Sequence, residues 1–308
     1  MVAGTNMGKR RFVKIWKFRH YYLLLFPAIV YVGIFHYGPM YGIQIAFKDY
    51  MGVLGVAGSP WVGFKHFISF FNSFYFTTIF RNTLMLSLYS LIAGFPLPIL
   101  LALMINELRE NRFRKSIQTI LYAPHFISMV VLIGMINTMF SPSMGIVNTV
   151  REAMGLERVY YMAIPRVFPH MYVWSGIWKS LGWNSIIYIA ALSSVDPQMH
   201  EAAIMDGASR IQRIRYINLP TISPTIVLLL ILSIGSLISV GYEQVFLLQN
   251  NLNVEYSEVI ATFVYKRGIL NRSYSFASAV GLFNNALNIS LLIIANGISR
   301  KVSKSGLF

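Results

Sequence analysis

Polar side chains that could bind a ligand are rare within the apolar stretches of this sequence of 308 residues. Those that occur there fall into three groups, one in each of three long apolar stretches. They are Trp174, Trp178, Lys179, Trp183 and Asn184 in the first, Tyr242 and Glu243 in the second, and Asn284, Asn285 and Asn288 in the third. Amides and charges can bind sugar hydroxyls, and aromatic rings can pack against sugar C–H faces, so these residues could line one polar, aromatic cavity.

A purely structural role for the same residues is also open. Lys179 and Glu243 could pair to hold two helices together, and the asparagines could hydrogen-bond between helices. The tryptophans could instead form a belt at a membrane interface. The choice depends on the separation of Lys179 and Glu243, which no sequence gives.

Motifs for catalysis, nucleotide binding and metal binding are missing from the sequence. The phosphate-binding pattern G-x-x-x-x-G-K-[ST] does not occur, and neither do H-E-x-x-H or G-x-S-x-G. There are no cysteines, and the six histidines, at positions 20, 36, 66, 125, 170 and 200, lack the spacing of metal ligands. The sequence therefore predicts a protein that is not an enzyme and holds no metal or cofactor of its own.

The composition is that of an integral membrane protein. Hydrophobic residues make up 56 % of the chain and charged residues only 12 %, against about 25 % charged in soluble domains. Apolar stretches of 20 or more residues are long enough to cross a bilayer as helices, and their continuous apolarity argues against a barrel. We therefore predict an all-α fold with six transmembrane helices, at residues 21–47, 77–105, 117–140, 171–195, 222–248 and 276–299. Gly38 and Pro39 should bend the first helix, and Pro96 and Pro98 the second.

The basic residues predict how this domain is oriented. The net charge of +15 would suit nucleic acid in a soluble protein, but here the basic residues cluster at the ends of apolar stretches. With the N-terminus inside, 16 of the 26 lysines and arginines face the cytoplasm, nine face outward, and Lys179 lies inside the fourth helix. The positive-inside rule thus predicts a basic cytoplasmic segment at 1–20, a membrane domain at 21–299 and a cytoplasmic C-terminus at 300–308. The opposite orientation fits the charges less well.

The segment 196–221 connects the fourth and fifth predicted helices on the cytoplasmic side. Asp196 and Pro197 suit the N-terminus of a short helix, and Gly207 permits a sharp bend before a second one. Pro220 should end that second helix. Its mixture of small, apolar and charged residues fits either a groove on a cytosolic partner or a position on lipid headgroups.

The spacing within "EAAIMDGASRIQRIRYINLP" decides between these two readings. It resembles the EAA motif of the permease subunits of binding-protein-dependent ATP-binding cassette (ABC) importers. The matching residues are Glu201, Ala202, Ala203, Asp206, Gly207, Ala208, Ile217, Leu219 and Pro220. The stretches "HYGPMYGIQIAFKDY", "SPWVGFKHF" and "YAPHFIS" are similar to permeases of the carbohydrate-uptake branch, in particular polysaccharide-type members, so the resemblance covers nearly the whole chain. Ile214 departs from the aromatic residue common in the family but preserves apolar packing.

The resemblance implies a function and a set of partners. The segment 196–221 would be the coupling element that enters a groove on a cytosolic ATPase, and the permease core would translocate an oligosaccharide, including uronate-containing ones. The implied partners are a second, related permease subunit, two ATPase subunits that bind ATP and Mg²⁺, and an extracytoplasmic substrate-binding protein. The implied location is the cytoplasmic membrane of a bacterium. The permease would contact membrane lipid there and would bind no nucleic acid.

Two alternatives stay open from the sequence. Within the importer class, the solute could be an amino acid, phosphate or a metal ion instead of a saccharide. From another class, an ion-coupled secondary transporter would need intramembrane carboxylates to carry protons or sodium, and Glu243 is the one good candidate.

Overall fold

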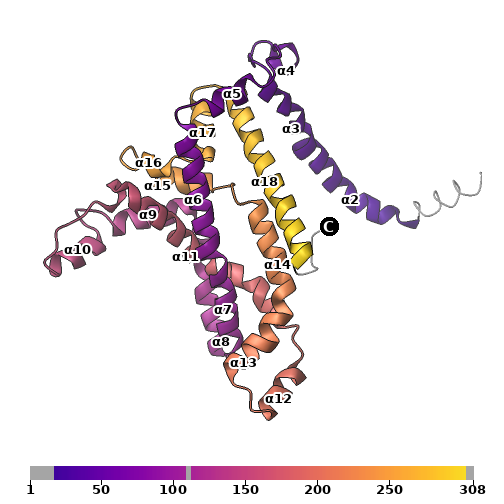
Figure 1. Cartoon of the computed structure of the whole chain (residues 1–308), viewed down its shortest axis with the longest axis vertical. Helices are drawn as coiled ribbons and strands as arrows, with labels where there is room; N and C mark the ends of the chain where they lie inside the picture. The colour runs from indigo at the N-terminus through magenta and orange to yellow at the C-terminus, as the bar shows by residue number, and fades with distance from the viewer. Residues whose placement is uncertain (1–16, 109–111, 303–308) are drawn as a thin grey trace, which may run out of the picture.

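Helices make up the ordered part of the chain in a computed structural model that describes residues 17–108 and 112–302. No strand occurs in these two ranges, where a single isolated bridge joins Lys48 and Trp61. The long helices run along the length of the molecule, with short helices at its two ends and on one side (Figure 1). The all-α prediction is confirmed over the described ranges. Most of the predicted basic segment 1–20 and of the C-terminal segment 300–308 lies outside them.

The first long helix is distorted where glycine and proline predicted a bend. Helix α2 (Arg19–Val32) continues through a π-helical turn (Gly33–Tyr37), α3 (Gly38–Met40) and a 3₁₀ segment (Tyr41–Phe47). No residue of α2 is buried, and it stands apart from the other helices (Figure 1). Only the 3₁₀ segment packs against the last helix, α18 (Tyr274–Val302). The apolar side chains of α2 are therefore free to meet lipid or another protein.

The second span consists of α6 (Phe76–Gly94) and α7 (Pro96–Asn106). They meet at Phe95, whose backbone angles remain helical, so the pair forms one span of 31 residues. Before it, α4 (Gly55–Gly58) and α5 (Lys65–Phe71) form the upper end of the molecule in Figure 1. Pro96 and Pro98 each remove one backbone donor from the helix, but the chain remains helical from Phe76 to Asn106, so the kink expected from them stays a prediction.

The third predicted helix, 117–140, is wrong as a single straight span. Helix α8 (Arg112–Tyr122) passes into a 3₁₀ turn (Ala123–Phe126), and α9 (Met129–Met139) then leaves at 95°. Pro124 removes a backbone donor and favours the break, while the Ser128 side chain accepts a hydrogen bond from Val131 N to start α9. Helix α10 (Ile146–Ala153) and short 3₁₀ turns at Tyr161–Ala163 and Pro165–Val167 follow.

The fourth span, α11 (Phe168–Leu192), lies at the centre of the fold. It packs against α6, α7 and α8, and against the helix α14 (Leu219–Gly235). Gly182 allows the close approach to α8, because a β-carbon there would lie 2.0 Å from the carbonyl oxygen of Leu121. Its 25 residues span about 37 Å at 1.5 Å per residue, which is enough to cross a bilayer.

The fifth predicted helix, 222–248, is also wrong in its bounds. Helix α12 (Pro197–Met205) precedes a continuous helix of 26 residues formed by α13 (Arg210–Arg213), a π-helical turn (Ile214–Asn218) and α14. Pro220 does not end this helix. The Leu219 N–H donates to Ile214 O in the π turn just before it, and the helix continues although Pro220 has no backbone N–H to donate. The helix ends instead at Gly235, and α15 (Tyr242–Leu248) is a separate short helix after an irregular stretch at 236–241.

The remaining elements connect α15 to the last span. They are α16 (Val254–Ser257), α17 (Ile260–Tyr265), a π-helical turn (Lys266–Leu270) and α18. Among the described residues, four helices are long and apolar enough to cross a membrane, and the bent pair of α8 and α9 would make a fifth. Helix α11 has the length but is less apolar, since it carries His170 and Lys179. The chain is thus a multi-pass membrane protein.

Candidate functional site

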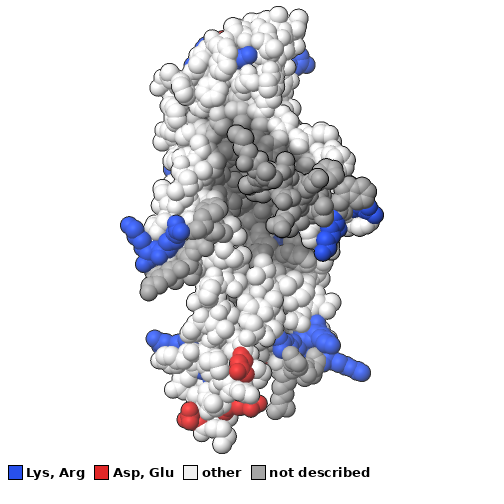
Figure 2. Space-filling view, turned by 90° about the vertical axis from the view of Figure 1, so that its right-hand side faces the viewer, with Lys and Arg blue, Asp and Glu red and all other residues white. Residues whose placement is uncertain are grey.

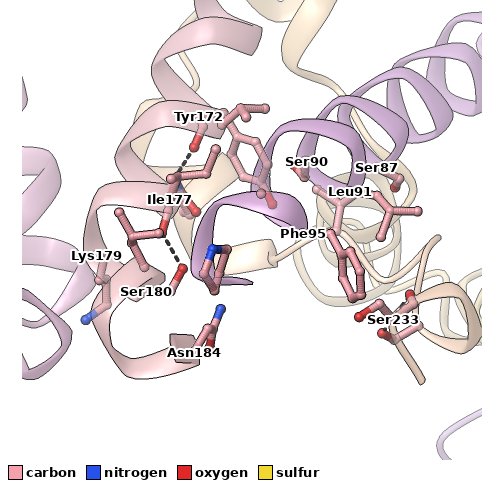
Figure 3. Close-up of a pocket in the computed structure, with 18 of the residues that line it drawn as sticks. Ser87, Ser90, Leu91, Phe95, Tyr172, Ile177, Lys179, Ser180, Asn184 and Ser233 are labelled. Carbon is pink, nitrogen blue, oxygen red and sulfur yellow. Dashed lines mark hydrogen bonds between the residues drawn. The ribbon is translucent and has the colours of Figure 1, made fainter. Parts of the chain in front are cut away.

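A cavity of about 590 Å³ lies between α6, α7, α11 and α14, near the middle of the long helices. Figure 3 shows Ser90 and Phe95 on the side of α6 and α7, and Ser180 and Asn184 on α11. Ser233 lines it from α14. Serine hydroxyls and an amide thus alternate with apolar side chains, which is the lining that a polyhydroxylated ligand needs.

Lys179 lies in the cavity wall but bonds to the backbone of the neighbouring helix break. Its ammonium donates to His125 O at 2.7 Å and to Ile127 O, at the point where the chain bends by 95°. One turn later on α11, the Trp183 ring stacks on the His125 ring, with 4.3 Å between the ring centroids and 4° between the planes. Lys179 and Trp183 therefore hold the bend in place, and Lys179 at the same time brings a positive charge to the cavity.

The pairing of Lys179 with Glu243, which the sequence left open, does not occur in the described structure. Glu243 is exposed in the first turn of α15, where the positive end of the helix favours a carboxylate, and no ion pair joins it to Lys179 in the described structure. Tyr242 packs against Tyr265 at 4.9 Å and is likewise outside the cavity lining. The next residue, Gln244, does line the cavity and donates to Tyr172 O at 2.7 Å.

One of the three asparagines of α18, Asn288, stabilises the fold and does not line the cavity. Asn288 is buried, its Oδ1 accepts from Ile238 N at 3.0 Å, and its Nδ2 donates to Ser239 Oγ at 2.9 Å. Asn288 thereby gives hydrogen-bond partners to two polar groups of the irregular stretch that follows α14. Asn285 is exposed, Asn284 has a buried Oδ1 without a partner in the described structure, and none of the three lines the cavity.

Two of the ten predicted cavity residues, Lys179 and Asn184, line the cavity. Trp174 and Trp178 are about half exposed, and the Trp174 Nε1 donates to the Tyr89 hydroxyl at 2.9 Å. The lining residues that the prediction missed include several with hydroxyl or amide groups. They are Ser87, Ser90, Ser180, Ser233, Ser236 and Ser239, together with Tyr172 and Gln244. The spacing of three residues at positions 87 and 90, and at 233, 236 and 239, within apolar stretches is a sequence signal that could have identified most of these serines.

The segment 196–221 forms the first short helix that the sequence predicted and the beginning of a second, longer helix. Asp196 accepts a hydrogen bond from Gln198 N at 2.9 Å and caps α12, which contains Glu201, Ala202 and Ala203. Gly207 then turns the chain with a φ of +78°, a value that glycine adopts without strain. The Gly207 N–H donates to Ile204 O at 3.0 Å and the Ala208 N–H to Ala203 O at 2.8 Å, so the turn satisfies the last carbonyls of α12.

The second helix of this segment continues into the span. Ser209 and Gln212 cap its start reciprocally, and Ile217, Leu219 and Pro220 lie within the continuous helix that ends at Gly235. Arg213 lies 3.8 Å from Glu107 at the end of α7, which ties the segment to a second span.

The tip of the segment exposes apolar side chains at one end of the molecule. Met205 is 87 % exposed and Ile211 77 % exposed, with Met199 and Ile204 beside them in the chain. Figure 2 shows acidic side chains gathered at the end where Figure 1 places α12, with basic ones close by. This surface combines exposed apolar groups with charges of both signs, as a protein-binding surface does.

Comparison with known families agrees with this arrangement. Residues 94–304 match the family described as "Binding-protein-dependent transport system inner membrane component". The chain belongs to this family. The matched range includes the segment 196–221, so the EAA motif of this chain lies within the part that matches the family.

Two curated relatives are similar to this chain over most or all of its length. The first is "Polygalacturonan/rhamnogalacturonan transport system permease protein YteP" of Bacillus subtilis (strain 168). This chain is 40 % identical to it over 308 residues, which is all of this chain and 96 % of the relative. The second is "Protein LplB" of the same organism. This chain is 43 % identical to it over 287 residues, which is 93 % of this chain and 90 % of the relative.

Solved structures show the same fold. The permease superposes with a TM-score of 0.88 and 42 % identity on a chain of a bacterial ABC transporter "involved in the import of the acidic polysaccharide alginate", covering 96 % of this chain and 99 % of that one. A second structure, with the same TM-score and identity, shows the bacterial alginate transporter "in complex with alginate pentasaccharide-bound periplasmic protein".

Replacing Asn288 by leucine should lower the stability of the permease without a change in its expression. The substitution leaves the buried Ile238 N–H without its partner, at a cost of about 1–3 kcal/mol, and it also removes the hydrogen bond to the exposed Ser239. The apparent melting temperature in detergent should therefore fall. Asn285→Leu, the same change at an exposed position of α18, is the control and should leave the melting temperature nearly unchanged. Equal melting temperatures for the two variants would remove this role of Asn288.

Proposed function

We propose that the permease translocates an oligosaccharide that carries carboxylates, as the transmembrane subunit of an ATP-driven importer. The observation that carries the proposal is the match over the full chain to a permease whose name gives polygalacturonan and rhamnogalacturonan, both of them acidic saccharides. The similar solved transporter imports alginate, a third acidic polysaccharide.

The lining of the central cavity supports an acidic saccharide. Its serines, Asn184 and Gln244 offer hydrogen bonds to hydroxyls, while Phe95 and Tyr172 offer ring surfaces. Lys179 is the charged residue among the lining residues that the structure gives, and none of these is a carboxylate. A uronate would therefore meet one attractive charge and no repulsive one.

The position of Glu243 argues against an ion-coupled mechanism. A secondary transporter carries protons or sodium on carboxylates that face the transport pathway. Glu243 is exposed on α15 and does not line the cavity. Energy must then come from outside this chain, which fits ATPase partners that bind ATP and Mg²⁺ while the permease itself hydrolyses nothing.

The segment 196–221 is the proposed contact with an ATPase. Its exposed apolar tip at Met205 and Ile211 would enter a groove of the partner, and Glu201 and Asp206 would supply charge around it. The continuous helix from Arg210 to Gly235 connects this contact directly to the wall of the cavity at Ser233. A movement of the ATPase would thus reach the substrate pathway through a single element.

The proposed assembly contains a second permease, two ATPases and an extracytoplasmic binding protein. No residue of α2 is buried, so this helix leaves an apolar surface that a related permease subunit could cover. Counting α8 with its 3₁₀ turn and α11 as spans gives the predicted six, with both termini and the segment 196–221 on the cytoplasmic side of a bacterial membrane. In Figure 1 the start of α2 and the end of α18 both lie below α4 and α5, on the side towards α12, which supports this proposal.

Accessibility to a thiol reagent tests the topology. The chain contains no cysteine, so a single introduced cysteine reports its own side of the membrane. A membrane-impermeant maleimide should label Ser69→Cys in intact cells and should label Ser209→Cys only after permeabilisation. Labelling of Ser209→Cys in intact cells would reverse the assigned orientation.

Two substitutions test the coupling segment. Glu201→Lys reverses a charge, and Gly207→Pro is incompatible with a φ of +78° and removes the donor to Ile204 O. Both positions lie outside the spans, so membrane insertion should be unchanged. Retention of the ATPase during purification and ATP-dependent uptake should each fall by about tenfold or more, the effect of about 1.4 kcal/mol or more at an interface.

Glu157→Lys makes the same charge change as Glu201→Lys at an exposed residue of another segment, and it should retain uptake. Normal uptake with a bound ATPase in either of the two test variants would refute the coupling assignment.

The charge of Lys179 tests the substrate class. Lys179→Met should reduce uptake of trigalacturonate about tenfold more than uptake of a neutral trisaccharide that the importer also accepts, because the acidic ligand loses a charge-assisted hydrogen bond. Lys179→Arg keeps the charge and should preserve the preference. An equal loss for both ligands would make Lys179 purely structural. Stimulation of ATP hydrolysis by an amino acid or phosphate in place of saccharides would overturn the saccharide proposal.

A further inference from the structure

A second cavity, of about 620 Å³, lies at the end of the molecule opposite the segment 196–221. Its walls come from residues 49–51, α5, α17 and the start of α18. The backbone N–H of Tyr50 donates to Ser275 Oγ at 2.8 Å, and the Tyr50 and Tyr274 rings meet edge to face at 6.0 Å, so its two sides are joined. None of its lining residues belongs to the central cavity.

The charge of this second cavity is positive and uncompensated. Arg267 and Arg272 line it, both are exposed, and in the described part of the chain neither guanidinium forms an ion pair or a hydrogen bond. The carboxylate among the lining residues, Asp49, is already bound by Lys65 Nζ at 2.7 Å and by His66 Nε2 at 3.0 Å. The hydrogen bond from Lys65 lowers the pKa of Asp49 below its usual value, so this carboxylate stays ionised and engaged.

Two further features mark the same point, and the second of them adds positive potential. Arg272 has a φ of +55°, a left-handed conformation that costs a residue with a side chain and that persists mainly at functional positions. Two residues later begins α18, a helix of 29 residues with no acidic residue in its first turn. The N–H groups and the positive end of this helix dipole therefore add to the two guanidiniums.

We propose that this cavity is a docking site for carboxylate side chains of the extracytoplasmic substrate-binding protein. The inference rests on the proposed function, which assigns the delivery of substrate to such a protein. Exposed guanidiniums bind carboxylates in a bidentate geometry, and a positive concave surface attracts an acidic partner over a distance. A protein side chain suits this cavity better than the saccharide does, because the cavity is open at the end of the molecule and separate from the lining of the central pathway.

A carbodiimide cross-link tests the chemistry of the partner directly. In the assembled importer, Arg272→Lys places a primary amine at the cavity, and the reagent joins it to a contacting carboxylate as an amide, taking up the water that is lost. We expect mass spectrometry to find the peptide that carries the introduced lysine joined to an Asp- or Glu-containing peptide of the binding protein that co-purifies with the wild-type complex. A cross-link to Asp49, a uronate adduct or no cross-link would each overturn the proposal.

Stimulation of ATP hydrolysis by the binding protein supplies the second test. Arg267→Glu and Arg272→Gly should each raise the half-saturating concentration of binding protein about tenfold, while the rate without binding protein stays unchanged. Arg272→Gly removes the charge and relieves the φ of +55°, so it should be at least as stable as the wild type. Arg166→Glu, at an exposed arginine before α11 and outside this cavity, is the control and should change little.

The outcomes separate this inference from the proposed function. If the wild-type importer is not stimulated by any binding protein, the proposed function and the docking site both fail. If it is stimulated and the two arginine variants behave like Arg166→Glu, only the docking site fails. Increasing salt should weaken binding of the wild type more than binding of Arg267→Glu, since the attraction is between charges.

Discussion

Backbone groups at helix breaks inside an apolar medium must find partners within the protein, and the fold around the central cavity depends on this constraint. The chain breaks twice beside the cavity, after Phe126 and after Gly235. Lys179 supplies donors to the carbonyls of the first break, and Asn288 supplies an acceptor and a donor to the second. These two side chains thus give hydrogen-bond partners to backbone groups that the helix breaks leave without helical ones.

The serines that line the cavity are suited to passage rather than to tight binding. Ser180 donates to Gly176 O at 2.7 Å and Ser233 to Leu229 O at 2.8 Å, one turn back on their own helices. These two hydroxyls are therefore satisfied without a ligand, and their oxygens can still accept a hydrogen bond from a sugar. The Ser87 hydroxyl, by contrast, is buried without a partner in the described structure, so a saccharide would gain a new contact there and weaker ones at Ser180 and Ser233.

The sequence predicted the local features well, because their causes are local. Asp196, Pro197 and Gly207 act on neighbours within a few residues, and the structure shows the cap and the turn that they indicated. The roles of Lys179 and Asn288 could not be predicted in this way. Their partners lie 54 and 50 residues away in the chain, and both partners are backbone groups, which carry no signature in the sequence. A polar residue in an apolar stretch looks the same whether it faces a ligand or a broken helix.

The unbroken helix from Arg210 to Gly235 has a mechanical consequence. A rod of 26 residues is about 39 Å long, so a tilt of about 10° about one end displaces the other by about 7 Å. Two separate helices joined at Pro220 would absorb much of such a tilt at their joint. The π turn at Ile214–Asn218 keeps the rod continuous, and it places the most compliant turn of this lever next to its attachment to Glu107. In the proposed coupling to an ATPase, the length and stiffness of this one helix would set the amplitude of the motion at the cavity, and shortening or softening it would uncouple force from displacement.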